Sequence, residues 1–177
     1  MVMAVWKVDA SHTNVGFAVR HMMVSKVRGR FTGFEGTLNG DPENLTEATI
    51  NFTIDASTID TGNKDRDDHL RSADFFEVEK YPNITFKSTK IEKNDDKYNV
   101  TGDMTIRDVT KSVTFETEYL GSGKNPWGVE VAAFEAKTKI SRKEFDLTWN
   151  QTLEAGGVLV GDDIEITIET ELNPETE

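Results

Sequence analysis

Cysteine is absent from this chain of 177 residues. A chain without cysteine forms no disulfide, holds no zinc–thiolate site or iron–sulfur cluster, and has no cysteine nucleophile. Long hydrophobic runs are absent too, and no segment approaches the roughly 20 apolar residues that a membrane-spanning helix needs. These absences favour a domain stabilised by its own hydrophobic core, and we expect no stable insertion into a membrane.

The amino terminus, MVMAVWKVDASH, lacks the basic segment and long apolar run of a secretory signal. We therefore expect a cytoplasmic protein, which the initial Met favours. The alternative is that a signal was removed before this numbering begins.

Basic residues are scarce relative to acidic ones. The chain has 20 Lys and Arg against 32 Asp and Glu, a formal net charge of −12. Nucleic acids and anionic membrane surfaces repel such a protein on average, so we expect no nucleic-acid partner. The charge is uneven, however, because the segment from residue 10 to 34 has no acidic residue and contains Arg20, Lys26, Arg28 and Arg30.

Apolar residues recur mainly with a period of two, as in Ile50, Phe52 and Ile54. Alternation of this kind is typical of strands with one dry face and one wet face. Turn residues such as Asn94-Asp95-Asp96 separate the runs. Residues 63–73 are polar and have no β-branched side chain, which indicates a short surface helix.

The sequence therefore predicts an all-β fold, an antiparallel barrel of about eight strands with one or two short helices. A chain of this length suits one domain, which can bury roughly two-thirds of its unfolded surface. A barrel of about eight strands is either filled by side chains or holds one small ligand, and the alternation does not distinguish these cases.

Several motifs follow one another in an order and spacing that resemble a known family. They are Val8-Asp9-Ala10-Ser11-His12-Thr13, Phe17-Ala18-Val19-Arg20-His21, Gly29-Arg30-Phe31, Arg66-Asp67-Asp68-His69-Leu70-Arg71-Ser72-Ala73-Asp74-Phe75-Phe76, Tyr81-Pro82-Asn83-Ile84-Thr85-Phe86-Lys87-Ser88 and Gly102-Asp103-Met104-Thr105-Ile106-Arg107-Asp108-Val109-Thr110-Lys111. From about Trp6 to Leu172 the chain resembles the YceI-like family of polyisoprenoid-binding proteins. The resemblance implies one YceI-like domain over residues 1–177, with an extended lipocalin-like barrel whose apolar tunnel takes a long isoprenoid chain or another amphiphile.

Twelve residues on alternating segments are candidates for the wall of such a tunnel. Taken alone they fit a filled core equally well, and the resemblance is what implies a tunnel. His21 continues the dry side of its strand and could be a polar group at the mouth. The candidates are Phe17, Val19, His21, Phe31, Phe52, Ile54, Phe86, Met104, Ile106, Phe115, Phe134 and Trp149.

The basic residues suggest a site for a ligand's head group. Lys26, Arg28 and Arg30 are spaced two apart, so on a strand they share one face. Together with Arg20 they could contact an anionic head group or a partner. The alternative is an ordinary solvated stripe that is balanced by acidic residues on a neighbouring strand.

A metal site is not expected. His12 and His21 are nine residues apart, a separation of about 30 Å along an ideal strand. A turn or capping hydrogen bond is the simpler role for His12. The Asp-rich segment that begins at Asn63 lacks the Gly and the Glu of a calcium-binding loop, since Asp68 and Asp74 occupy those positions.

We therefore expect a binding protein that has no cofactor and no catalytic residue. Its ligand would be a polyisoprenoid, an isoprenoid quinone or a similar lipid, which the protein carries, stores or senses. One alternative is a small enzyme acting on such a lipid, with His21 and a carboxylate as acid and base. Another is an interaction protein with a filled barrel. The sequence leaves open whether two copies form a homodimer.

Overall fold

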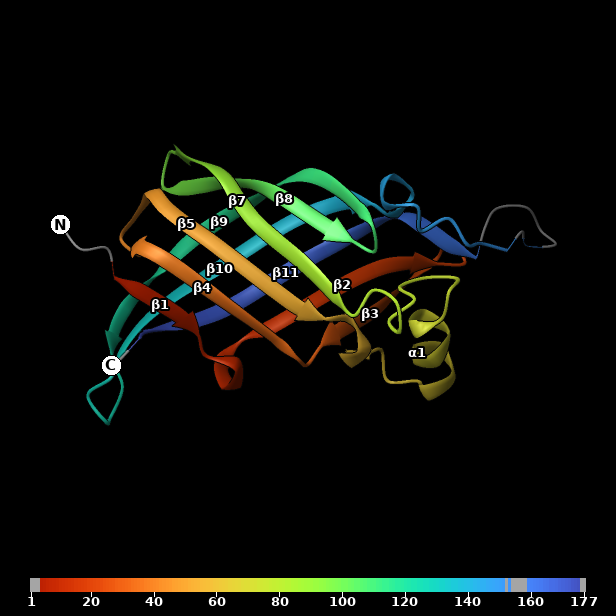
Figure 1. Cartoon of the computed structure of the whole chain (residues 1–177), viewed down its shortest axis with the longest axis horizontal. Coiled ribbons are helices and arrows are strands. Elements are labelled where there is room, and N and C mark those ends of the chain that lie inside the picture. The colour runs from red at the N-terminus through yellow and green to blue at the C-terminus, as the bar shows by residue number, and fades with distance from the viewer. Residues whose placement is uncertain (1–3, 152, 154–158, 176–177) are drawn as a thin grey trace.

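A computed structural model describes residues 4–151, 153 and 159–175. Its strands form one continuous antiparallel sheet, and a single α-helix lies outside it (Figure 1). The strands are β1 (Val5–Val8), β2 (Asn14–His21), β3 (Ser25–Phe31), β4 (Phe34–Asp41), β5 (Asn44–Asp55), β6 (Ile59–Asp60), β7 (Asn83–Asn94), β8 (Lys97–Ile106), β9 (Val109–Lys124), β10 (Glu130–Ser141) and β11 (Val160–Pro174). The helices are α1 (Lys64–Arg71) and the 3-10 helices η1 (Ala10–His12), η2 (Ala56–Thr58) and η3 (Arg142–Phe145).

Eight strands close into a barrel in the order β1-β4-β5-β7-β8-β9-β10-β11, and β11 pairs with β1 to complete the ring. All of these strand pairs are antiparallel. In the pair that closes the barrel, β1 with β11, Val8 lies opposite Leu172. The prediction of an antiparallel barrel of about eight strands with few helices is confirmed. Closure gives each of the eight barrel strands a hydrogen-bonded neighbour on both sides.

The barrel is extended because two of its strands continue beyond a break. Strand β1 leads through η1 into β2, and both lie against β11, with Val15 opposite Ile168. Strand β3 pairs with β2, and β4 pairs with β1, so β3 and β4 continue one another in the same way. Figure 1 shows β1 and β4 along one half of the barrel and β2 and β3 along the other.

Helix α1 begins where the polar segment predicted a helix. The side chain of Asn63 caps it by accepting a hydrogen bond from the Arg66 N–H at 3.0 Å. Acidic residues in the first turn and basic residues in the last turn complement the helix dipole. Buried Asp67 accepts hydrogen bonds from the backbone and hydroxyl groups of Thr61, which hold the helix beside β6. The helix therefore covers one end of the barrel (Figure 1).

Candidate ligand cavity

A cavity of about 220 Å³ lies inside the barrel. Its wall is formed by the inward-facing residues of the strands, together with Leu70 of α1 and Phe75 and Phe76 just after it. The wall is almost wholly aliphatic and aromatic. The few polar residues in it are mostly threonines, whose methyl groups are compatible with an apolar interior. An apolar space of this kind receives apolar groups.

Ten of the twelve predicted tunnel residues line this cavity. They come from seven different strands, and closure of the barrel brings their inward-facing side chains to one interior. Whether they contact a ligand stays a prediction. The ten are Phe17, Val19, Phe31, Phe52, Ile54, Phe86, Met104, Ile106, Phe115 and Phe134.

His21 and Trp149 are not part of the cavity wall. His21 is the last residue of β2, opposite Ser25 and Val160, and lies beyond the cavity at the end of the strand. Trp149 follows η3 in a segment without regular strand structure, where the period of two does not apply. Its ring packs against those of His69 and Phe75, with centroids 4.6 and 5.5 Å away.

Aromatic rings hold part of the wall in place. The rings of Phe86 and Phe115 meet edge to face with centroids 5.2 Å apart, and Phe31 meets Phe76 in the same way at 6.0 Å. Such pairs add to the stability that burial provides. They also limit how far each ring can move into the open space.

Strands β10 and β11 contribute a second set of wall residues, which were not proposed as ligand contacts from the sequence. Ile164, Ile166 and Ile168 alternate with polar residues, so the same signal could have identified them. Ala136 is different, because its small side chain leaves space rather than filling it. No pattern in the sequence distinguishes this alanine from others.

Arg142 is the one charged side chain among the described residues of the wall. It is 2% exposed. Its guanidinium group donates to the carbonyl oxygens of Gly161 (2.8 Å), Leu147 (2.6 Å), Trp149 (2.9 Å) and Val160 (3.3 Å). Burial lowers the pKa of this guanidinium from its ordinary value.

Four of the five N–H groups of Arg142 are thereby occupied, and Nη2, which carries the fifth, also lies 3.9 Å from a carboxylate oxygen of Asp162. The side chain fastens the segment around Leu147 to the start of β11. It also places a positive charge beside the apolar cavity. Sequence analysis missed it, because an Arg that follows a strand is normally assigned to the surface.

The basic stripe on β2 and β3 lies on the outer face of the sheet. Lys26 contacts both carboxylate oxygens of Glu165 on β11 at 3.0 Å, which lowers the pKa of that carboxyl group below its ordinary value. Arg30 lies 3.8 Å from Asp60 on β6. For these two residues the structure shows neighbouring acids, as the solvated-stripe alternative expects. Arg20 and Arg28 are exposed, and a role for all four toward a head group stays a prediction.

None of the helices in the described part of the chain is long and apolar enough to span a bilayer.

The barrel, its extension through β2 and β3, and its apolar interior define a lipocalin-like class of protein. Residues 6–172 match the YceI-like domain family, and the chain belongs to that family. It is 42% identical over 148 residues to Protein YceI of Escherichia coli O157:H7, a match covering 82% of this chain and 78% of the relative.

Solved structures share the fold. The YceI protein of Campylobacter jejuni has a TM-score of 0.75 and 36% identity, with 96% of each chain covered. A polyisoprenoid binding domain from Saccharophagus degradans has a TM-score of 0.71 and 11% identity, covering 97% of this chain and 99% of that one. The second likeness is one of fold alone.

Proposed function

We propose that the protein binds a long-chain amphiphile, such as a polyisoprenoid, an isoprenoid quinone or a similar lipid, inside the barrel. The observation that carries the proposal is the apolar cavity of about 220 Å³ among closely packed aromatic residues. Protein interiors are normally packed without such spaces. The name of the domain from Saccharophagus degradans, which has the same fold, is in keeping with this ligand class.

Transfer of the ligand's chain out of water supplies the binding energy. Each methylene group that enters the cavity contributes about 0.8 kcal/mol. Atoms that face an empty space lack partners for dispersion contacts, and an apolar chain supplies those partners. The ligand therefore needs few polar contacts, and its chemical identity is specified mainly by thickness and length.

The polar end of the ligand lies near Arg142 in this proposal. Arg142 is the charged group of the described wall, and one of its N–H groups has no backbone partner. A hydroxyl, carbonyl or phosphate oxygen could accept a hydrogen bond there. Such a contact would orient the chain within the barrel.

Binding is favoured over catalysis because the described wall contains no Asp, Glu or His. Acid–base chemistry needs a titratable group within hydrogen-bond reach of the reacting atom. His21, the acid–base candidate from the sequence, is not in the wall. We accordingly propose that the protein carries, stores or senses its ligand without changing it.

Native mass spectrometry of the purified protein, followed by organic extraction, tests this function. We expect a bound species whose mass matches an extracted lipid, and displacement of that lipid by an added isoprenoid quinone. Incubation of the extracted lipid with the protein should return it unchanged. Protein that is free of lipid and also fails to bind quinones and isoprenoid alcohols would overturn the proposal.

A further inference from the structure

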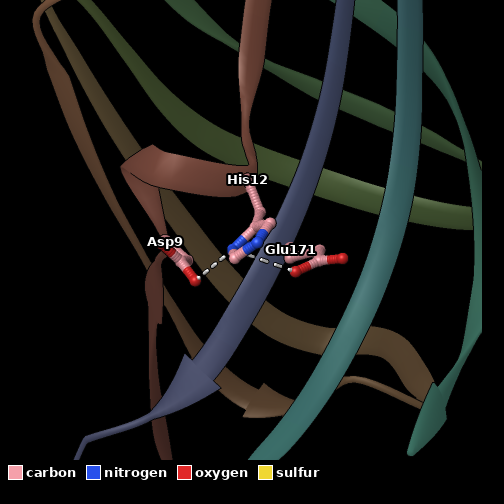
Figure 2. A group of neighbouring side chains, drawn as sticks. All are labelled: Asp9, His12 and Glu171. Atoms are coloured by element: carbon pink, nitrogen blue, oxygen red, sulfur yellow. Dashed lines mark hydrogen bonds and ion pairs between the residues drawn. The ribbon is translucent and has the colours of Figure 1, made fainter. Parts of the chain in front are cut away.

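A histidine and two carboxylates converge on the outer face of the barrel, away from the cavity. They are Asp9, His12 and Glu171 (Figure 2). One potential ligand atom from each residue lies within 4.8 Å of those of the other two. Glu171 is on β11, whereas Asp9 caps the turn η1 and His12 is its last residue, so residues from opposite ends of the chain form the cluster.

The backbone fixes this arrangement. The turn η1 interrupts the strand that runs along β11, between Val8 opposite Leu172 and Asn14 opposite Glu169. At the interruption the Asp9 N–H donates to the carbonyl oxygen of Glu171 at 2.8 Å. The three side chains are therefore held on one surface by main-chain pairing.

The side-chain atoms of the cluster are close enough for one metal ion to reach all three. Nδ1 of His12 lies 2.9 Å from Oδ2 of Asp9 and 3.6 Å from Oε2 of Glu171. Zinc bonds of about 2.0–2.2 Å at tetrahedral angles place neighbouring ligand atoms about 3.4 Å apart. The 2.9 Å contact is a hydrogen bond between His12 and Asp9, and Nδ1 of His12 also lies 3.2 Å from the Ser11 hydroxyl. A metal ion would take the place of these hydrogen bonds at Nδ1, and the two observed distances lie on either side of the tetrahedral spacing.

The other oxygen of Asp9 is already engaged. Its Oδ1 accepts hydrogen bonds from the Ser11 N–H at 3.1 Å and the Ser11 hydroxyl at 2.7 Å. These bonds orient the carboxylate so that Oδ2 is directed toward His12. Metal-binding carboxylates commonly have an outer oxygen held in this way.

The cluster is open to solvent on one side. The side chains of Asp9, His12 and Glu171 are 26%, 63% and 37% exposed. They border a shallow surface pocket that also includes Lys124 and Trp127. Water could supply a fourth ligand from this side.

We propose that Asp9, His12 and Glu171 bind a divalent transition-metal ion, Zn²⁺ foremost, which links η1 to β11. The imidazole nitrogen selects such an ion over Ca²⁺ and Mg²⁺, because those ions prefer sites made wholly of oxygen ligands. No metal site was expected from the spacing of the histidines or from the Asp-rich segment. Glu171 completes the proposed site from 159 residues further along the chain than His12.

Isothermal titration of the chelator-treated protein with Zn²⁺ tests the site. We expect one equivalent to bind with a micromolar dissociation constant, and Ca²⁺ and Mg²⁺ not to bind at the same concentrations. Asp9→Asn, His12→Gln and Glu171→Gln should each weaken Zn²⁺ binding at least tenfold. Zn²⁺ should raise the melting temperature of the wild type, and chelator should reverse the rise.

Asp74→Asn is the matched control. Asp74 lies 2.9 Å from Nε2 of His69, so this variant removes the carboxylate of an equivalent exposed His–Asp pair that has no third ligand in the described structure. It should bind Zn²⁺ like the wild type. Retention of lipid binding by the three site variants would show that they are folded. Absence of Zn²⁺ binding by the wild type at 100 µM, or unchanged affinity in all three site variants, would overturn the proposal.

Discussion

Filling the cavity should strongly weaken lipid binding while leaving the barrel folded, and Ala136→Phe is the most direct way to fill it. Ala136 faces the cavity from the middle of β10, opposite Ile168 on one side and Thr117 on the other. A phenyl ring at this position would project into open space. It therefore competes directly with the ligand for volume.

The expected magnitude follows from the displaced chain. A phenyl group takes the space of about three to four methylene groups, which are worth about 0.8 kcal/mol each, so binding loses about 3 kcal/mol. That loss corresponds to an increase in the dissociation constant of about 100-fold. Burial of the ring offsets any strain from overpacking, so the free energy of unfolding should change by less than about 2 kcal/mol.

The assay is displacement of a fluorescent fatty-chain probe, with urea unfolding measured in parallel. Ala133→Phe is the control, because Ala133 is on the same strand and borders the outer surface pocket instead of the cavity. It should bind the probe like the wild type. If Ala136→Phe binds with wild-type affinity while remaining folded, the ligand does not occupy this cavity and the reasoning fails.

Three further changes test other parts of the structure. Arg142→Met should lower the free energy of unfolding by about 2–4 kcal/mol, because buried carbonyl oxygens of Gly161 and Leu147 lose their donor, and urea unfolding measures this loss. Phe52→Ala should lower the free energy of unfolding by less than the roughly 3–5 kcal/mol that this change costs in a filled core, since part of the ring already borders open space. A loss of the full 3–5 kcal/mol in urea unfolding, the roughly expected value for a filled core, would contradict this. Lys26→Met should raise the pKa of Glu165 toward its ordinary value in a carboxyl NMR titration. Because that pKa is lowered in the folded wild type, the pair's small contribution to stability is present above the ordinary carboxyl pKa and is lost as pH falls through the lowered value.

The strands could be predicted from the sequence because a period of two is a local property. Phe52 and Ile54 face inward for the same reason that their neighbours face outward, and closure of the barrel then brings ten predicted residues to one cavity. The helix at residues 64–71 could be predicted for the same reason, because its capping residue and its charged first and last turns all lie within or next to the segment itself. Trp149 lies outside the cavity wall because it follows the last turn of η3, where the structure has no strand and the period of two does not apply.

The remaining features depend on pairing between distant strands. Arg142 is buried because the start of β11 returns over it, and only that return supplies the carbonyl oxygens it needs. Glu171 meets His12 because β1 and β2 share β11 as a partner with a turn between them. Alternation predicts neither the position of the start of β11 over Arg142 nor the pairing that brings Glu171 to His12. Many strand pairings keep the same residues facing inward and satisfy the alternation equally well.

The cavity and the proposed zinc site lie on opposite faces of the same sheet, so they should act independently. Leu172 faces the cavity while its neighbour Glu171 faces outward, and the backbone bond between Asp9 and Glu171 already joins the two segments without metal. If the metal leaves this pairing unchanged, it has the same affinity for the lipid-bound and the lipid-free barrel. A metal with equal affinity for both states does not change the equilibrium between them. The probe's dissociation constant should therefore agree within about twofold with and without Zn²⁺, although Zn²⁺ raises the melting temperature in both cases. A larger change would show that η1 moves when the cavity fills, and that closure of the barrel at β1 and β11 is part of ligand binding.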